Sequence, residues 1–149
     1  MSLSVIAKDP WKPTFIASVD GADIVVRNVR ATYFGGDNDP QDDGTTASGT
    51  NTKGNPDIMG CALPMNYSHA CSGSPIPRIP WHTKVHVFCH ETKKECDVTL
   101  IDIGPSKPPL ASGEIDLTVA AYKLLAGNLN DDITVDYRII GAGHLLKEL

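Results

Sequence analysis

Short runs of alternating apolar and polar residues constrain the fold of this chain more than any other feature. Residues 83–88 alternate strictly, and residues 97–101 follow a polar tip as an antiparallel partner. Residues 133–140 alternate in the same way. A period of two turns one face of a strand towards a core and the other towards water. We therefore expect a fold built mainly from β-strands.

Long irregular segments separate these predicted strands. Residues 15–19 and 24–30 flank an Asp-Gly pair that ends at Gly21, which favours a tight hairpin turn. Residues 35–60 are rich in Gly, Asp, Asn, Thr and Pro, and residues 65–80 form a second irregular region. Irregular segments of this length in a small domain are usually functional loops or disordered.

One helix is predicted, over residues 119–125. Thr118 is a suitable N-cap and Gly127 fits the position just beyond the C-terminus of the helix. A helix this short is not stable alone and must pack on the sheet. We therefore predict an all-β fold, a β-barrel with one short inserted helix.

Length and charge restrict the class of protein. The chain has 149 residues, which suits a single domain over 1–149, and a net charge of −5 argues against a sequence-independent nucleic-acid binder. No apolar run reaches the length of about eighteen residues that a membrane span needs. Lys8 and Asp9 interrupt the N-terminal apolar stretch, so we expect that an exported protein would have lost its signal before this sequence begins.

The cysteines predict two local disulfides and no metal site. Cys61 and Cys71 lie ten residues apart, and Cys89 and Cys96 lie seven apart across a predicted hairpin. Neither spacing is typical of zinc ligands. We expect the bonds Cys61–Cys71 and Cys89–Cys96, and therefore an oxidising, extracytoplasmic compartment. Four reduced thiols in a cytosolic protein are the alternative.

Two carboxylates stand at the ends of apolar segments. Asp102 ends the predicted strand 97–101, and Asp116 directly precedes the helix. A carboxyl group beside apolar neighbours has a raised pKa and can donate a proton near neutral pH. Alternatively, Asp116 caps backbone amides before the helix and Asp102 is a turn residue.

Five segments in order resemble the double-psi β-barrel wall proteins. They are residues 31–35 (ATYFG), 44–49 (GTTASG), 79–85 (IPWHTKV), 100–105 (LIDIGP) and 113–121 (GEIDLTVAA). The third resembles the family's L/I-P-x-G-T-x-V segment, the fourth its V-x-D-x-G-P segment and the fifth its G-R-I-I-D-L-S-x-A-A segment. Members include the rare-lipoprotein-A family, the three-aspartate domain of membrane-bound lytic transglycosylase A and the first domain of expansins.

This resemblance implies a six-stranded double-psi β-barrel. Its core would span about residues 24–140, with 1–14 and 141–149 as extensions and with long loops held by the disulfides. A polysaccharide groove would cross one face, and the acids of the family map onto Asp102 and Asp116. No cofactor is implied, and the expected partner is peptidoglycan or another β-1,4-glycan, bound by a monomer.

The resemblance also narrows the chemistry. Family 45 endoglucanases place a second acid where this chain has Gly35, so hydrolysis through an activated water loses support unless Asp37 or Asp39 supplies that acid. A lytic transglycosylase needs only one carboxyl group, which implies Asp102 as acid and base with Asp116 tuning it. The family's His before the L-P-x-G-T strand is missing, and His82 replaces a Gly. A non-catalytic expansin-like module and a barwin-like secreted protein are the alternatives.

Six further residues are expected to contact the glycan. They are Tyr33, Thr46, Ser48, His69, Trp81 and His82. Trp81, Tyr33 and Tyr67 would stack on sugar rings, although Tyr33 is equally consistent with a place in the core. The acidic residues of segment 37–43 suit a solvated loop, and Ca²⁺ binding is the alternative.

Overall fold

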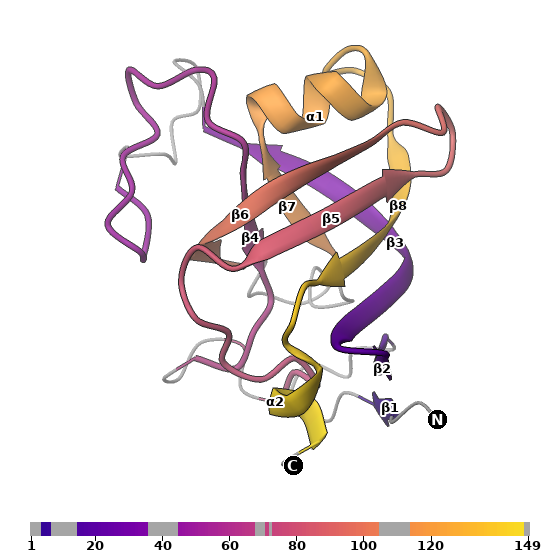
Figure 1. Ribbon diagram of the computed structural model, residues 1–149. Coiled ribbons are helices and arrows are strands. Elements are labelled where there is room, and N and C mark those ends of the chain that lie inside the picture. The colour runs from indigo at the N-terminus through magenta and orange to yellow at the C-terminus, as the bar shows by residue number, and fades with distance from the viewer. Residues whose placement is uncertain are drawn as a thin grey trace.

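Six strands close into a β-barrel in the computed structural model (Figure 1), which describes residues 4–6, 15–35, 45–67, 71, 73–104 and 114–147. Around the barrel the strands are β3 (Asp23–Phe34), β7 (Ile115–Thr118), β4 (Gly60–Leu63), β6 (Glu95–Ile103), β5 (Lys84–Cys89) and β8 (Ile133–Ile139). β8 pairs back onto β3 and so closes the barrel. β2 (Ile16–Asp20) pairs with β3, and β1 (Ser4–Ile6) pairs with β2.

The barrel is mixed. β3 is parallel to β7 and β4 is parallel to β6, whereas the other four pairings around the barrel are antiparallel. The predicted all-β class and the six-stranded barrel are therefore confirmed. The structure has two short helices, α1 (Val119–Ala126) and α2 (Gly143–Lys147), where one was predicted.

The barrel interior is filled by the inward-facing side chains of every strand. The largest fully buried residues include Tyr137, Leu100, Leu117 and Ile139. α1 lies across the top of the barrel in Figure 1 and contributes Leu125 to the same core. Burial of this apolar surface is the main driving force for folding of the domain.

The residue types at turns explain where several strands and helices begin or end. Gly21 takes a φ of 63° in the β2–β3 turn and Gly127 a φ of 86° after α1. Both values lie in the left-handed region that glycine tolerates at no steric cost. Thr118 precedes α1 as predicted, but its side chain makes no cap hydrogen bond. Its Oγ1 donates to the Ile58 carbonyl at 2.6 Å instead.

The two predicted disulfides are absent, because none of the four cysteines forms a disulfide in the structure. Register explains one pair: Cys96 lies opposite Val87, two positions from Cys89. Such diagonal neighbours are about 7–8 Å apart, beyond the usual Cα–Cα range of about 4.4–6.8 Å for a disulfide. In the other pair, Cys61 belongs to the barrel core, whereas Cys71 is buried outside that cluster.

The thiols should react slowly in the folded protein. Burial, with the nearby charge of Asp97, raises the pKa of Cys96 to about 11, and burial raises that of Cys71 to about 11. The thiolate is the nucleophile, so alkylation of Cys96 at pH 7 should be roughly 100-fold slower than that of an unperturbed thiol and should accelerate with pH. Mass spectrometry after timed alkylation measures this rate. Four alkylated cysteines in the unfolded, unreduced protein are expected, and a mass showing an intact disulfide would contradict the structure.

Some predictions fall outside the described residues. His69 and the acidic segment 37–43 are among them. Within the part of the chain that the structure describes, no helix has the length and apolar character needed to cross a membrane.

Candidate active site

The two acids lie in one row across the outer surface of the barrel. Ala62 of β4 is opposite Asp116 of β7 on one side and opposite Asp102 of β6 on the other. Asp116 is in turn opposite Thr32 of β3. Residues directly opposite each other in a ladder point to the same face of the sheet. The row Thr32–Asp116–Ala62–Asp102, which we call the acid row, therefore presents both carboxylates on one face.

A β-bulge places Asp102 on this face. Cys61 is opposite Leu100, but the next residue, Ala62, is opposite Asp102, so Ile101 is the extra residue. Leu100 belongs to the interior, and strict alternation would turn Asp102 inward as well. Bulges commonly redirect side chains beside functional sites. The extra residue reverses the alternation and directs Asp102 outward.

The separation of the two acids limits the chemistry. They lie two strands apart, which places their Cα atoms roughly 10 Å apart at about 4.8 Å per strand. This backbone spacing is wider than the roughly 5–5.5 Å that separates the carboxyl groups of retaining glycosidases. The row suits one proton-transferring carboxyl group with a second acid at a distance.

Asp102 is held by two backbone amides. Its Oδ1 accepts hydrogen bonds from the Ala47 N–H at 3.1 Å and from the Ile103 N–H at 2.9 Å. A proton donated to a ligand must therefore come from Oδ2. Ala47 is part of a tight turn closed by the Thr45–Asn51 bridge, and the Ser48 N–H of this turn donates to the Ile101 carbonyl at 3.1 Å. The turn thus clamps both residues of the bulge.

Asp116 is oriented by a residue that the sequence did not single out. Thr32 Oγ1 donates to Asp116 Oδ1 at 2.8 Å. Thr32 lies between Ala31, which faces the core, and Tyr33. Strict alternation from the core residues Ile24 and Val26 would turn Thr32 inward, and the register shift between Val26 and Val29 brings it to the outer face. Its position beside Tyr33 in the ATYFG motif is the one signal that could have found it.

A third carboxyl group lies two residues before Asp116. Glu114 is only 7% exposed, and its Oε2 has no hydrogen-bond partner within the described ranges. Burial raises the pKa of Glu114, while the positive charge of Arg30 opposes this shift. Glu114 therefore carries more proton near neutral pH than an exposed glutamate does.

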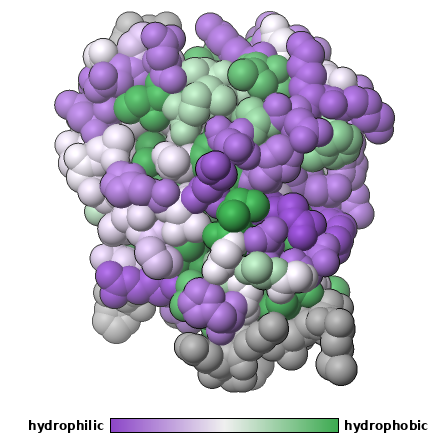
Figure 2. Space-filling model, in the orientation of Figure 1, coloured by the Kyte–Doolittle hydropathy of each residue, from purple (hydrophilic) through white to green (hydrophobic). Residues whose placement is uncertain are grey.

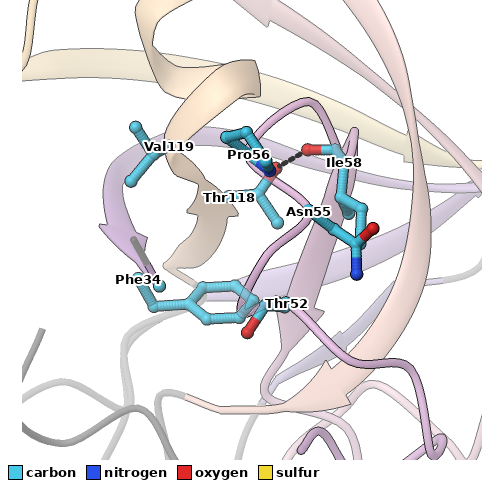
Figure 3. A pocket seen from close by; sticks show the side chains of 8 residues that line it. Phe34, Thr52, Asn55, Pro56, Ile58, Thr118 and Val119 are labelled. Carbon is cyan, nitrogen blue, oxygen red and sulfur yellow. Dashed lines mark hydrogen bonds between the residues drawn. The ribbon is translucent and has the colours of Figure 1, made fainter. Parts of the chain in front are cut away.

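A pocket adjoins the acid row. Phe34 follows Thr32 by two residues on β3, and Thr118 follows Asp116 by two on β7, so Phe34 and Thr118 lie opposite each other on the same face. Together with Ile58 and Val119 they line a small hollow with a cavity volume of about 50 Å³. Figure 3 shows the Phe34 ring on one side of this hollow and Val119, Pro56 and Ile58 on the other.

The predicted glycan-binding residues are only partly brought together. Thr46 is buried, and its Oγ1 donates to the Thr50 carbonyl at 2.9 Å, so it shapes the turn that holds Asp102. Ser48 belongs to the same turn. Tyr33 is 45% exposed but packs edge-on against Tyr122 of α1, with ring centroids 5.1 Å apart. Its neighbours Thr32 and Phe34 face the acids and the pocket instead.

Trp81 and His82 lie beside the end of β6. The His82 N–H donates to the Leu100 carbonyl at 2.8 Å, which fixes this segment two residues from Asp102 in β6. Trp81 is half-buried, and its ring centroid is 5.5 Å from that of Tyr67. The Arg78 guanidinium lies 4.4 Å from the Tyr67 ring centroid. His82 is exposed, with a φ of 67°. Among the described residues, no group of three or more His, Cys, Asp or Glu is placed to hold a metal ion.

Gly60 makes room for the bulge. A Cβ at this position would lie 2.6 Å from Ile101 Cδ1. We expect Gly60→Ala to destabilise the fold by about 1–3 kcal/mol, because the Ile101 side chain has to move within a packed layer. Ile101→Val removes Cδ1, so the double variant should lose less stability than the sum of the two single variants. Urea denaturation measures all three variants, and additive losses would contradict this contact.

The sequence matches no protein-family model, and no curated protein matches it at a significant level. The acid row, the turn that clamps it and the adjoining pocket are therefore the features that point to a function.

Proposed function

We propose that this chain is a double-psi β-barrel domain that cleaves the glycan strands of a cell-wall polysaccharide of the peptidoglycan type. The observation that carries the proposal is the acid row, in which Asp102 and Asp116 flank Ala62 on one outer face of the barrel. These are the two acids that the motif resemblance selected. The substrate would lie across β6, β4 and β7.

The positions of the motifs in the barrel support the placement in this superfamily. Residues 31–35 form the end of β3, and residues 79–85 lead into β5. Asp102 lies near the end of β6 and Asp116 lies within β7. Segments that are remote in sequence thus meet at one face, as a shared site requires. The paired parallel strands of the mixed barrel are compatible with the double-psi topology.

The mechanism needs one carboxyl group that gives and then takes a proton. Asp102 Oδ2–H protonates the glycosidic oxygen as the bond from that oxygen to the anomeric carbon breaks. The 6-hydroxyl of the same sugar then attacks its anomeric carbon, and its proton returns to the Asp102 carboxylate. The products are a new chain end and a 1,6-anhydro sugar, with no water consumed. The wide separation from Asp116 suits this single-acid route better than a covalent intermediate.

Asp116 would stabilise positive charge that develops at the anomeric carbon. The hydrogen bond from Thr32 Oγ1 fixes one of its oxygens, so the carboxylate is preorganised before the substrate binds. Such a substrate lies outside the cytoplasm, and the proposal therefore includes an extracytoplasmic location. This location draws no support from the cysteines, because none of the four forms a disulfide.

A non-catalytic, expansin-like wall-binding module is the second candidate. The observation that favours it is the pair of amides on Asp102 Oδ1, because backbone N–H donors stabilise a carboxylate that only accepts hydrogen bonds. It would use the same face to separate glycan strands without bond cleavage.

Incubation with purified peptidoglycan sacculi separates the two candidates. Mass spectrometry of the soluble fraction should show fragments that end in 1,6-anhydro sugars. Fragments with reducing ends would indicate hydrolysis instead. Binding to sacculi without release of any fragment would support the expansin-like module and end the catalytic proposal.

A further inference from the structure

The pocket beside the acid row is a recognition site for one substituent of the bound sugar. We propose that it receives the 2-acetamido group of an N-acetylated β-1,4-glycan, so that the domain selects acetylated over unsubstituted or deacetylated strands. This inference rests on the proposed function, because the pocket would select among glycans that already lie across the acids.

The position of the pocket links it to the acids. Phe34 lies two residues after Thr32 on β3, and Thr118 lies two residues after Asp116 on β7. All four side chains therefore lie on the same face of the sheet. Two residues along a strand correspond to roughly 6.6–6.8 Å. A sugar ring bound at the acid row can therefore place one of its substituents in the pocket, while the ring itself stays outside.

The walls of the pocket are preformed. Thr118 Oγ1 donates to the Ile58 carbonyl at 2.6 Å (Figure 3). It also accepts from the Gly60 N–H at 3.1 Å. Both hydrogen bonds fasten the segment before β4 to the barrel wall. The hydroxyl of Thr118 is thereby occupied, and this residue offers the pocket its methyl group. An occupant meets a fixed shape with little to reorganise on binding.

The chemistry of the lining fits an acetamido group. The described lining contains no charged side chain, and Phe34, Pro56, Ile58 and Val119 supply apolar surface for a methyl group. Asn55 adds a polar side chain to the lining, and its Nδ2 donates to the Asn51 carbonyl at 2.9 Å. A water molecule needs about 10–15 Å³ of cavity volume, so the cavity volume of about 50 Å³ accommodates a group of about four heavy atoms, the size of an acetamido group.

Other substituents would fit the pocket less well. On the face shown in Figure 2, hydrophobic patches lie at the top, at the centre and in the lower part of the view, between hydrophilic side chains. Within the described lining, an ammonium group, as in a deacetylated amino sugar, would lose its hydration without meeting a counter-charge. A hydroxyl group would leave the apolar walls unfilled.

Three hexasaccharides of equal length test the inference: chito-oligosaccharide, its fully deacetylated form and cello-oligosaccharide. We expect the acetylated ligand to bind roughly tenfold more tightly than either of the others, the usual range for one apolar group in a pocket. Val119→Phe should fill the pocket and reduce binding of the acetylated ligand to that of cello-oligosaccharide. Leu124→Phe, at a 45% exposed position on the same helix, is the matched control and should keep the preference.

Saturation-transfer NMR on the unaltered protein provides a second readout that does not depend on the folding of a variant. The acetyl methyl protons should receive the strongest saturation of all ligand protons. Equal affinity for the three ligands, or weak saturation of the methyl group, would overturn the inference and leave the proposed function standing. Failure of all three ligands to bind would reject both.

Discussion

Asp102→Asn should lower the rate of glycan cleavage by about 10²–10⁴-fold while binding to sacculi survives. General acid–base catalysis contributes a factor of this size, and an amide cannot donate the required proton to the glycosidic oxygen with comparable acidity. The fold should persist, because the Asn carbonyl can still accept the hydrogen bonds of Ala47 and Ile103. Initial rates of 1,6-anhydro product release from sacculi measure the effect.

Asp97→Asn is the matched control for this variant. Asp97 lies on the same strand but is exposed and contacts His86 at 2.7 Å rather than the acid row. Its replacement should leave the cleavage rate within about twofold of the original. If the Asp102 variant cleaved glycan at the wild-type rate, Asp102 would be excluded as the proton donor. Asp116 and Glu114 would then be the remaining candidates for that role.

Tyr137→Ala should cost about 3–5 kcal/mol of the free energy of unfolding, the range for a large aromatic removed from a core. Tyr137 is fully buried on β8 and lies opposite Val26 of β3 and Val87 of β5, so its ring fills the seam where the barrel closes. Burial raises the pKa of its phenol strongly. A small domain has only about 5–15 kcal/mol in total, so this loss approaches global unfolding.

Thermal or urea denaturation measures this loss, with Tyr33→Ala as the control. Tyr33 is 45% exposed and makes one edge-on contact with Tyr122, so its truncation should cost about 1 kcal/mol. Similar losses of unfolding free energy in the two variants would show that Tyr137 is not buried in the barrel core.

Turns and helix ends could be predicted from the sequence where the conformational preferences of a few neighbouring residues determine them. The Asp-Gly turn, the β5–β6 hairpin and the glycine after α1 all follow from preferences of a few neighbouring residues. β4 was missed because its four residues are all buried and show no alternation. β7 was missed for a related reason, since its four residues run directly into α1.

The site was harder to predict because it depends on contacts between remote residues. The sequence singled out Asp102 and Asp116, but alternation along β6 would have turned Asp102 into the core. Only the bulge at Ile101, clamped by the turn at Ala47, brings it to the surface. The role of Thr32 and the displacement of Tyr33 to the α1 side depend on the register of β3 with β7.

The disulfide prediction failed for the same reason. Cysteine spacing predicts which pairs are near in sequence, but only strand register shows that Cys89 and Cys96 are diagonal neighbours. Likewise, Thr118 has the residue type of a helix cap, yet its hydroxyl fastens the segment at Ile58 to the barrel. In both cases long-range pairing overrides a local preference.

An NMR titration with a soluble N-acetylated β-1,4-glycan tests the central claim, that the acid row is the glycan-binding face, most directly. The amides of Ala47 and Ile103 donate to Asp102 Oδ1 and report on any ligand at that carboxylate. We expect these two amides, together with Ala62, to show the largest chemical-shift changes, and Asp102→Asn to alter them while binding persists. Changes confined to Trp81 and Tyr67, or to the opposite face around Arg138, would contradict the account.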